Sequence, residues 1–130
     1  MRVVEFTGGS TGSSLALVCA VKGYRFVPVS SDAFAKEKLD TMRAFGADLQ
    51  LVDSDGGRIT PDLFVRMRAA VDRLCEEPGT YWTDQFHNAD AITGYDGYWT
   101  RAGRADRRHA ARLLRCGGVP AGCWQVCRRR

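Results

Sequence analysis

The chain has 130 residues, of which 45% are hydrophobic and 26% charged, and its formal net charge is +4. This length allows one domain, since domains run to roughly 100–200 residues, and the apolar content excludes disordered and collagen-like proteins. No apolar run approaches the about 20 residues that span a bilayer. The first residues lack the pattern of a secretory signal, so we expect a soluble, cytoplasmic protein.

Residues 101–130 differ in composition from the rest of the chain. They contain nine arginines, one aspartate and no lysine, a charge of +8, whereas residues 1–100 carry −4. Three of the five cysteines, Cys116, Cys123 and Cys127, also lie there. An odd number of cysteines in a chain expected to be cytoplasmic argues against a disulfide framework. We therefore interpret residues 1–100 as one domain and residues 101–130 as a separate arginine- and cysteine-rich tail.

Strand and helix patterns alternate along the first hundred residues. A β-prone run over residues 3–6 and a β-branched and aromatic run over residues 24–29 predict the first two strands, and we expect a third strand over 47–52 and a short fourth one over 80–82. Helical spacing of apolar residues predicts helices over 13–22, over a segment that follows the N-cap candidates Ser30, Ser31 and Asp32 and ends at Gly46, and over 60–75. Such alternation is typical of βαβ units. We predict an α/β fold, a parallel sheet of about four strands with helices on both faces, followed by an irregular basic tail.

A glycine-rich loop, Thr7-Gly8-Gly9-Ser10-Thr11-Gly12, separates the first predicted strand from the first predicted helix. The first turn of a helix has N–H groups without intrahelical partners and the positive end of the helix dipole, so it binds anions. The loop lacks the lysine of a Walker A motif and the glycine spacing of the dinucleotide fingerprint. It is consistent with a carboxylate or phosphate site, or with a plain strand-to-helix turn.

Several segments in order resemble the cysteine synthase branch of the fold-type II pyridoxal-phosphate-dependent enzymes. They are Glu5-Phe6-Thr7-Gly8-Gly9-Ser10-Thr11-Gly12, Gly23-Tyr24, the run from Met42 to Ala47, and Asp84-Gln85-Phe86-His87-Asn88-Ala89-Asp90. The resemblance covers residues 3–98 and corresponds mainly to the small domain of that family. It implies pyridoxal phosphate as the family cofactor, β-replacement or β-elimination on serine or an O-activated serine, and a dimer.

The resemblance also implies roles for single residues. The substrate α-carboxylate would be held by Thr7, Gly8, Gly9, Ser10, Thr11 and Gln85. Ser10 stands where the family has an asparagine that contacts the cofactor, and Gly8 stands where the family has a serine. The glycine removes one hydroxyl donor from the loop, and the serine side chain is shorter than that of asparagine.

The two main cofactor-binding features of the family, a lysine and a phosphate-binding loop, are not matched in this sequence. The family's Schiff-base lysine precedes the loop, and Lys22, Lys36 and Lys38 do not correspond to it. The second glycine-rich loop, which holds the cofactor phosphate, is also unmatched. We therefore assign no catalytic residue, doubt that this chain binds the cofactor, and expect it to be inactive by itself.

The tail has three interpretations. Codons shifted by one base across Gly118 to Val126 can encode Gly-Thr-Gly-Gly-Met-Leu-Ala-Gly, which resembles the family's phosphate loop, so we interpret the tail as out-of-frame translation starting between about residues 98 and 115. The alternative is a basic module that binds nucleic acid or a partner protein. His109 and the three tail cysteines have zinc-ligand chemistry but not zinc-site spacing, so we assign no metal site.

Overall fold

The computed structural model describes residues 1–90 and 93–94. Within them, strands β1 (Arg2–Phe6), β2 (Arg25–Ser31), β3 (Gln50–Val52) and β4 (Thr80–Trp82) alternate with helices α1 (Ser10–Lys22), α2 (Lys36–Ala44) and α3 (Pro61–Cys75). All seven elements belong to a compact unit, Met1–Thr83, and a second unit begins at Asp84. In the described part of the chain, no helix is both long enough and apolar enough to cross a membrane.

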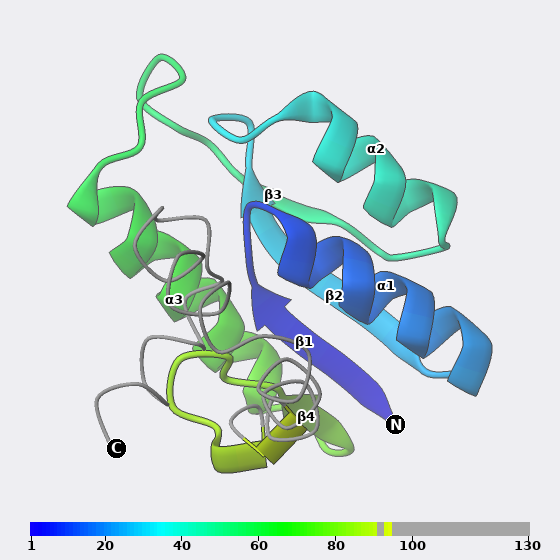
Figure 1. The fold of residues 1–130 in the computed structure, drawn as a ribbon. Coiled ribbons are helices and arrows are strands. Elements are labelled where there is room, and N and C mark those ends of the chain that lie inside the picture. The colour runs from blue at the N-terminus through cyan, green and yellow to red at the C-terminus, as the bar shows by residue number, and fades with distance from the viewer. Residues whose placement is uncertain (91–92, 95–130) are drawn as a thin grey trace, which may run out of the picture. The chain divides into compact units, whose positions relative to one another are not determined.

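The four strands form one parallel sheet in the order β3-β2-β1-β4. Helices α1 and α2 lie side by side on one face of this sheet, and α3 lies on the other face (Figure 1). Parallel strands need long crossover connections, and the three helices supply them. The predicted α/β fold, with about four parallel strands and helices on both faces, is confirmed.

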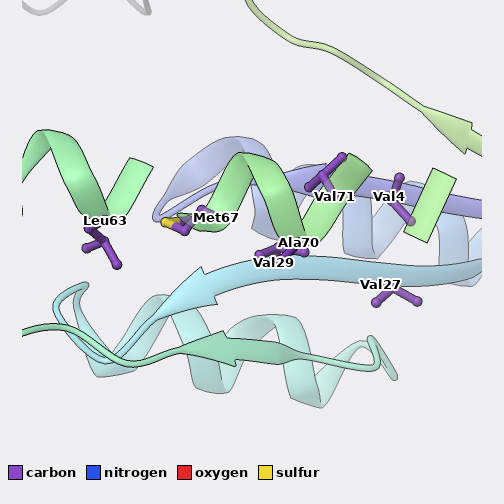
Figure 2. Packing of buried hydrophobic residues seen from close by; sticks show 7 residues of the cluster. All are labelled: Val4, Val27, Val29, Leu63, Met67, Ala70 and Val71. Atoms are coloured by element: carbon purple, nitrogen blue, oxygen red, sulfur yellow. The ribbon is translucent and has the colours of Figure 1, made fainter. Parts of the chain in front are cut away.

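One apolar core lies between the sheet and α3. Alternate side chains of β1 and β2 point to this face, where they meet the apolar stripe of α3. Figure 2 shows the seven buried residues of this cluster: Val4, Val27, Val29, Leu63, Met67, Ala70 and Val71. This core fixes β1 against β2 and so fixes where both strands end.

The second core lies under α1 and α2. The other side chains of β1 and β2, Val3 and Phe26, pack there with Leu39 and Met42 of α2. Helix α1 presents only small buried residues to the sheet: Gly12, Ala16 and Cys19. Small residues let α1 approach the sheet closely. The loop at the N-terminus of α1 therefore also lies close to the sheet.

The helix starts differ from the sequence prediction in two places. Helix α1 begins at Ser10, three residues earlier than predicted, so half of the glycine-rich loop is already helical. The prediction that Ser30, Ser31 or Asp32 caps α2 is wrong, because the N-cap residue is Ala35. Ser31 and Asp32 instead form hydrogen bonds in the turn before the helix. Strand β3 is also shorter than the predicted 47–52.

Candidate functional site

The carboxyl end of β1 lies at the point where the strand order of the sheet reverses. From β1 the chain continues through α1 to β2 on one side, whereas α3 returns it to β4 on the other side of β1. Ligands of open parallel sheets bind at such a switch point, outside the carboxyl ends of the strands. The residues that follow β1 and β4, beginning with Thr7 and Thr83, therefore occupy the expected position of a binding site.

The loop after β1 leaves backbone donors available. The Thr7 N–H extends the ladder by donating to the Val29 carbonyl at 2.9 Å, and the Gly9 N–H faces the Thr7 hydroxyl at 3.4 Å. The first bond of α1 runs from the Ser13 N–H to the Gly9 carbonyl. Ser10, Thr11 and Gly12 then have N–H groups with no acceptor among the described residues. Three such groups at a helix start form an anion site.

Hydroxyl groups surround these backbone donors. Ser10 is exposed and Thr11 half-buried, whereas Thr7 is buried beneath the turn. Two further hydroxyls, those of Ser13 in the first turn of α1 and of Ser30 next to Val29, are buried without a hydrogen-bond partner in the part of the chain that is described. Buried polar atoms usually have a partner. The surroundings of the loop therefore suit a polar ligand.

A buried carboxyl group connects the two strand ends at the switch point. Glu5 is fully buried, and its side chain accepts a hydrogen bond from the Thr83 hydroxyl at 2.6 Å. The Trp82 Nε1–H points to the same carboxyl group at 3.4 Å. Because Glu5 lies two residues before Thr7, these contacts hold the end of β4 beside the start of the loop. No sequence pattern assigns a binding role to Glu5 or Thr83.

A second polar contact fixes the turn between β2 and α2. The Asp32 side chain accepts hydrogen bonds from the Ser54 N–H at 2.8 Å and from the Ser31 hydroxyl at 3.0 Å. Hydrogen bonds from the side chain and backbone of Ser54, together with that of Ser31, hold the pKa of Asp32 below its usual value. The turn after β2 is thereby tied to the loop after β3.

We expect this contact to make stability depend on pH. A carboxyl group with a lowered pKa in the folded state stabilises the fold above its unfolded pKa, about 3.9, and this contribution is lost as the pH falls through the folded pKa. In thermal unfolding followed by circular dichroism, Asp32→Asn should melt at a lower temperature than the wild type at pH 7. The difference should shrink below about pH 4. A difference that stays constant down to pH 3 would contradict the expectation.

The structure places the predicted site residues in two units. Thr7, Gly8, Gly9, Ser10 and Thr11 lie together at the end of β1. Gln85 is half-buried in the second unit, two residues after Thr83, and its contact with a carboxylate stays a prediction. The tail residues, including His109, Cys116, Cys123 and Cys127, lie outside the described residues, and so does the proposed change of reading frame.

Comparison with known proteins identifies relatives of the first hundred residues. The family model described as "Pyridoxal-phosphate dependent enzyme" matches residues 1–100. Cystathionine beta-synthase of Oryctolagus cuniculus is 35% identical over 96 residues, and O-ureido-L-serine synthase of Streptomyces lavendulae is 36% identical over 90 residues. These matches cover 72% and 66% of this chain, but 17% and 25% of the two relatives.

Solved structures show the same relationship. A hydrogen sulfide-producing enzyme from Fusobacterium nucleatum aligns with a TM-score of 0.61 and 28% identity over 71% of this chain and 28% of that enzyme. O-acetyl serine sulfhydrylase isoform 3 from Entamoeba histolytica aligns with a TM-score of 0.60 and 27% identity over 79% and 31%. The chain thus spans less than a third of the relatives named here. With a family match over residues 1–100 and relatives among the cysteine and cystathionine synthases, the chain belongs to the pyridoxal-phosphate-dependent enzyme family.

Proposed function

We propose that this chain binds the α-carboxylate of a serine-like amino acid at the loop Thr7–Thr11, as the substrate-binding part of a cysteine-synthase-like enzyme. The observation that carries the proposal is the set of N–H groups of Ser10, Thr11 and Gly12, which have no acceptor among the described residues. The dipole of α1 adds positive potential at the same place. O-ureido-L-serine synthase and O-acetyl serine sulfhydrylase, two of the relatives, are named for serine derivatives, which supports this substrate class.

Two kinds of group would share the carboxylate in this proposal. The three N–H groups would bind one carboxylate oxygen or both, and the hydroxyls of Ser10 and Thr11 would donate from the rim of the loop. Gln85, which the family resemblance assigns to the same carboxylate, would add an amide donor. Ser10, at the position of the family's asparagine, is the loop residue that the resemblance assigns to the cofactor.

The cofactor of the family fits the described residues poorly. When bound, pyridoxal phosphate acts as an electron sink for the reacting carbon. All three lysines, Lys22, Lys36 and Lys38, are exposed, and Lys22 lies in the last turn of α1, at the end of the helix opposite the loop. Among the described residues, the other pair of adjacent glycines is Gly56-Gly57, and both N–H groups of this pair already donate within their own turn, to the Ser54 carbonyl and hydroxyl. We therefore propose that this chain contributes binding rather than covalent chemistry.

The test is a titration of the ¹⁵N-labelled full chain followed by NMR. L-serine should shift the amide signals of Ser10, Thr11 and Gly12, whereas serinol, which has a second hydroxymethyl group in place of the carboxylate, should leave them unchanged. Replacing both hydroxyls (Ser10→Ala with Thr11→Ala) should weaken L-serine binding by at least about tenfold, since even one hydrogen bond to a charged group contributes roughly 1.5–3 kcal/mol. The matched control is Ser14→Ala, which changes an exposed serine one turn further along α1.

Two results would count against the proposal. Equal shifts with L-serine and serinol would show that the carboxylate is not recognised. The covalent part is tested separately by adding pyridoxal phosphate, reducing with borohydride and mapping the modified lysines by mass spectrometry. We expect no single lysine to be modified preferentially, and stoichiometric labelling of one lysine would contradict the assignment of binding without chemistry.

A further inference from the structure

The ring of Phe34 lies directly against the backbone of Gly8. A Cβ atom added at Gly8 would overlap with the Cγ, Cδ1 and Cε1 atoms of that ring, whereas a Cβ atom added at Gly9 would meet no atom within 4 Å. Phe34 thus fills the space that a side chain at position 8 would need. Because the ring occupies this space, position 8 cannot carry a side chain such as that of serine unless the ring moves.

The ring is also held from behind. Phe34 is half-buried and packs against the core cluster between the sheet and α3. Its N–H donates to the Ser31 carbonyl at 3.2 Å, and the Ala33 N–H donates to the Ser31 hydroxyl at 3.3 Å. The neighbouring Asp32 ties this turn to Ser54. Core, turn and loop together leave the ring little freedom to move away from Gly8.

The site therefore has two chemically different sides. Backbone N–H groups of Ser10, Thr11 and Gly12 lie at the helix start, and an aromatic ring covers the loop at Gly8, two residues earlier. We propose that Phe34 is a specificity-determining residue that forms an apolar wall for the substrate side chain and selects amino acids with an uncharged β-substituent over those with an anionic one. This inference rests on the proposed carboxylate site.

The physical basis is the difference between the two substituents at the ring. An uncharged thioether or alkyl group gains from burial against the ring, and sulfur makes favourable contacts with aromatic groups. A second carboxylate would lose hydration there without a partner, and the face of an aromatic ring carries negative potential. The positive end of α1 would already be occupied by the α-carboxylate.

The experiment compares two amino acids of similar size on the full chain. S-methyl-L-cysteine should bind about fivefold more tightly than L-aspartate, as measured by NMR titration, because about one methyl group is buried on the ring. Phe34→Ala should bring the two dissociation constants to within about twofold, and Phe34→Met should keep most of the preference. Phe34→Gln, which retains the packing of its methylene groups, is a second variant that should also lose the preference. Phe45→Ala, at the C-terminal end of α2, is the matched control and should keep it.

The outcomes separate this inference from the function on which it rests. If L-serine shifts the loop amides but Phe34→Ala or Phe34→Gln keeps the wild-type preference, the specificity role is wrong and the carboxylate site stands. The role is equally wrong if the wild type binds both amino acids alike. If no amino acid shifts the loop amides of the wild type, the proposed function fails and the role of Phe34 fails with it.

Discussion

Replacing Met67 with alanine is expected to lower the free energy of unfolding by about 3–4 kcal/mol. Met67 is fully buried in the middle of α3, within the cluster that joins this helix to β1 and β2. The truncation removes most of a side chain that belongs to the same buried cluster as Val4, Val27 and Val29, and it leaves a cavity that a sheet and a helix cannot close completely. The total free energy of unfolding of a small domain is roughly 5–15 kcal/mol, so the expected loss is a large fraction of it.

The measurement is urea unfolding of the full chain followed by far-UV circular dichroism. Val65→Ala is the matched control, because Val65 lies on the same helix with 66% of its surface exposed. We expect the control to stay within about 0.5 kcal/mol of the wild type. Equal losses for both variants would mean that α3 does not pack on the sheet through its Met67 face. The same core sets where β1 and β2 end, so Met67→Ala should also broaden the amide signals of Ser10 and Thr11.

Much of the fold follows from local sequence patterns. The alternation of strand and helix signals predicts the α/β class and the positions of the four strands. The two central strands, β1 and β2, are mostly buried, and a parallel strand buried on both faces is largely apolar. The start of α3 is also predictable. Thr60 supplies the N-cap oxygen, which accepts from the Leu63 N–H at 3.2 Å, and Pro61 occupies the first turn, where its missing N–H costs nothing.

The prediction of the α2 cap is wrong because the polar side chains before this helix have more than one possible hydrogen-bond partner. Ser31 and Asp32 have the composition of a helix cap, but their oxygens bond within the turn and to Ser54, which lies 22 residues away from Asp32. Serine and aspartate make such local bonds as readily as caps. The early start of α1 has another cause. The sequence pattern predicts that the helix starts after Gly12, although a glycine in a first helical turn is tolerated when it allows close packing.

The candidate site divides in the same way. The loop Thr7–Thr11 is predictable because its chemistry is local: a strand, several small residues and a helix start that follow one another in the chain. Phe34 and Thr83 are not predictable from local patterns, since their contacts with Gly8 and Glu5 join segments that are far apart in sequence. One available signal was Glu5 itself, a charged residue within an apolar strand, which is rarely buried without partners.

Gly12→Ala is expected to damage both stability and carboxylate binding. Gly12 is buried in the first turn of α1, and an added Cβ atom would lie 2.5 Å from Met42 Sδ and 2.6 Å from Thr7 Cγ2. Real contacts of this kind require more than 3 Å, so α1 or Thr7 must shift. Overpacking costs typically 1–3 kcal/mol, partly offset by the better helix propensity of alanine, and we expect a net loss of about 1–2 kcal/mol.

The effect on binding should exceed the effect on stability. The N–H groups of Ser10, Thr11 and Gly12 belong to the turn that must move, and hydrogen bonds weaken steeply when their geometry is disturbed. We expect L-serine to bind at least about tenfold more weakly, as measured by the NMR titration, in a variant that remains folded at 25 °C. Gly9→Ala is the control, because it tests whether replacing another glycine of the same loop lowers the stability as much as Gly12→Ala does. Its φ of −153° lies outside the left-handed region and its Cβ would meet no atom, so stability should change by less than about 0.5 kcal/mol.

A second variant separates packing from backbone effects. Met42→Ala removes the sulfur atom that the new Cβ would strike, so in that background Gly12→Ala should cost about 1 kcal/mol less than in the wild type. If the cost is unchanged, the shift must come from Thr7, and the loop rather than α2 limits how closely α1 can approach. If Gly12→Ala binds L-serine like the wild type, the first turn of α1 is not the carboxylate site.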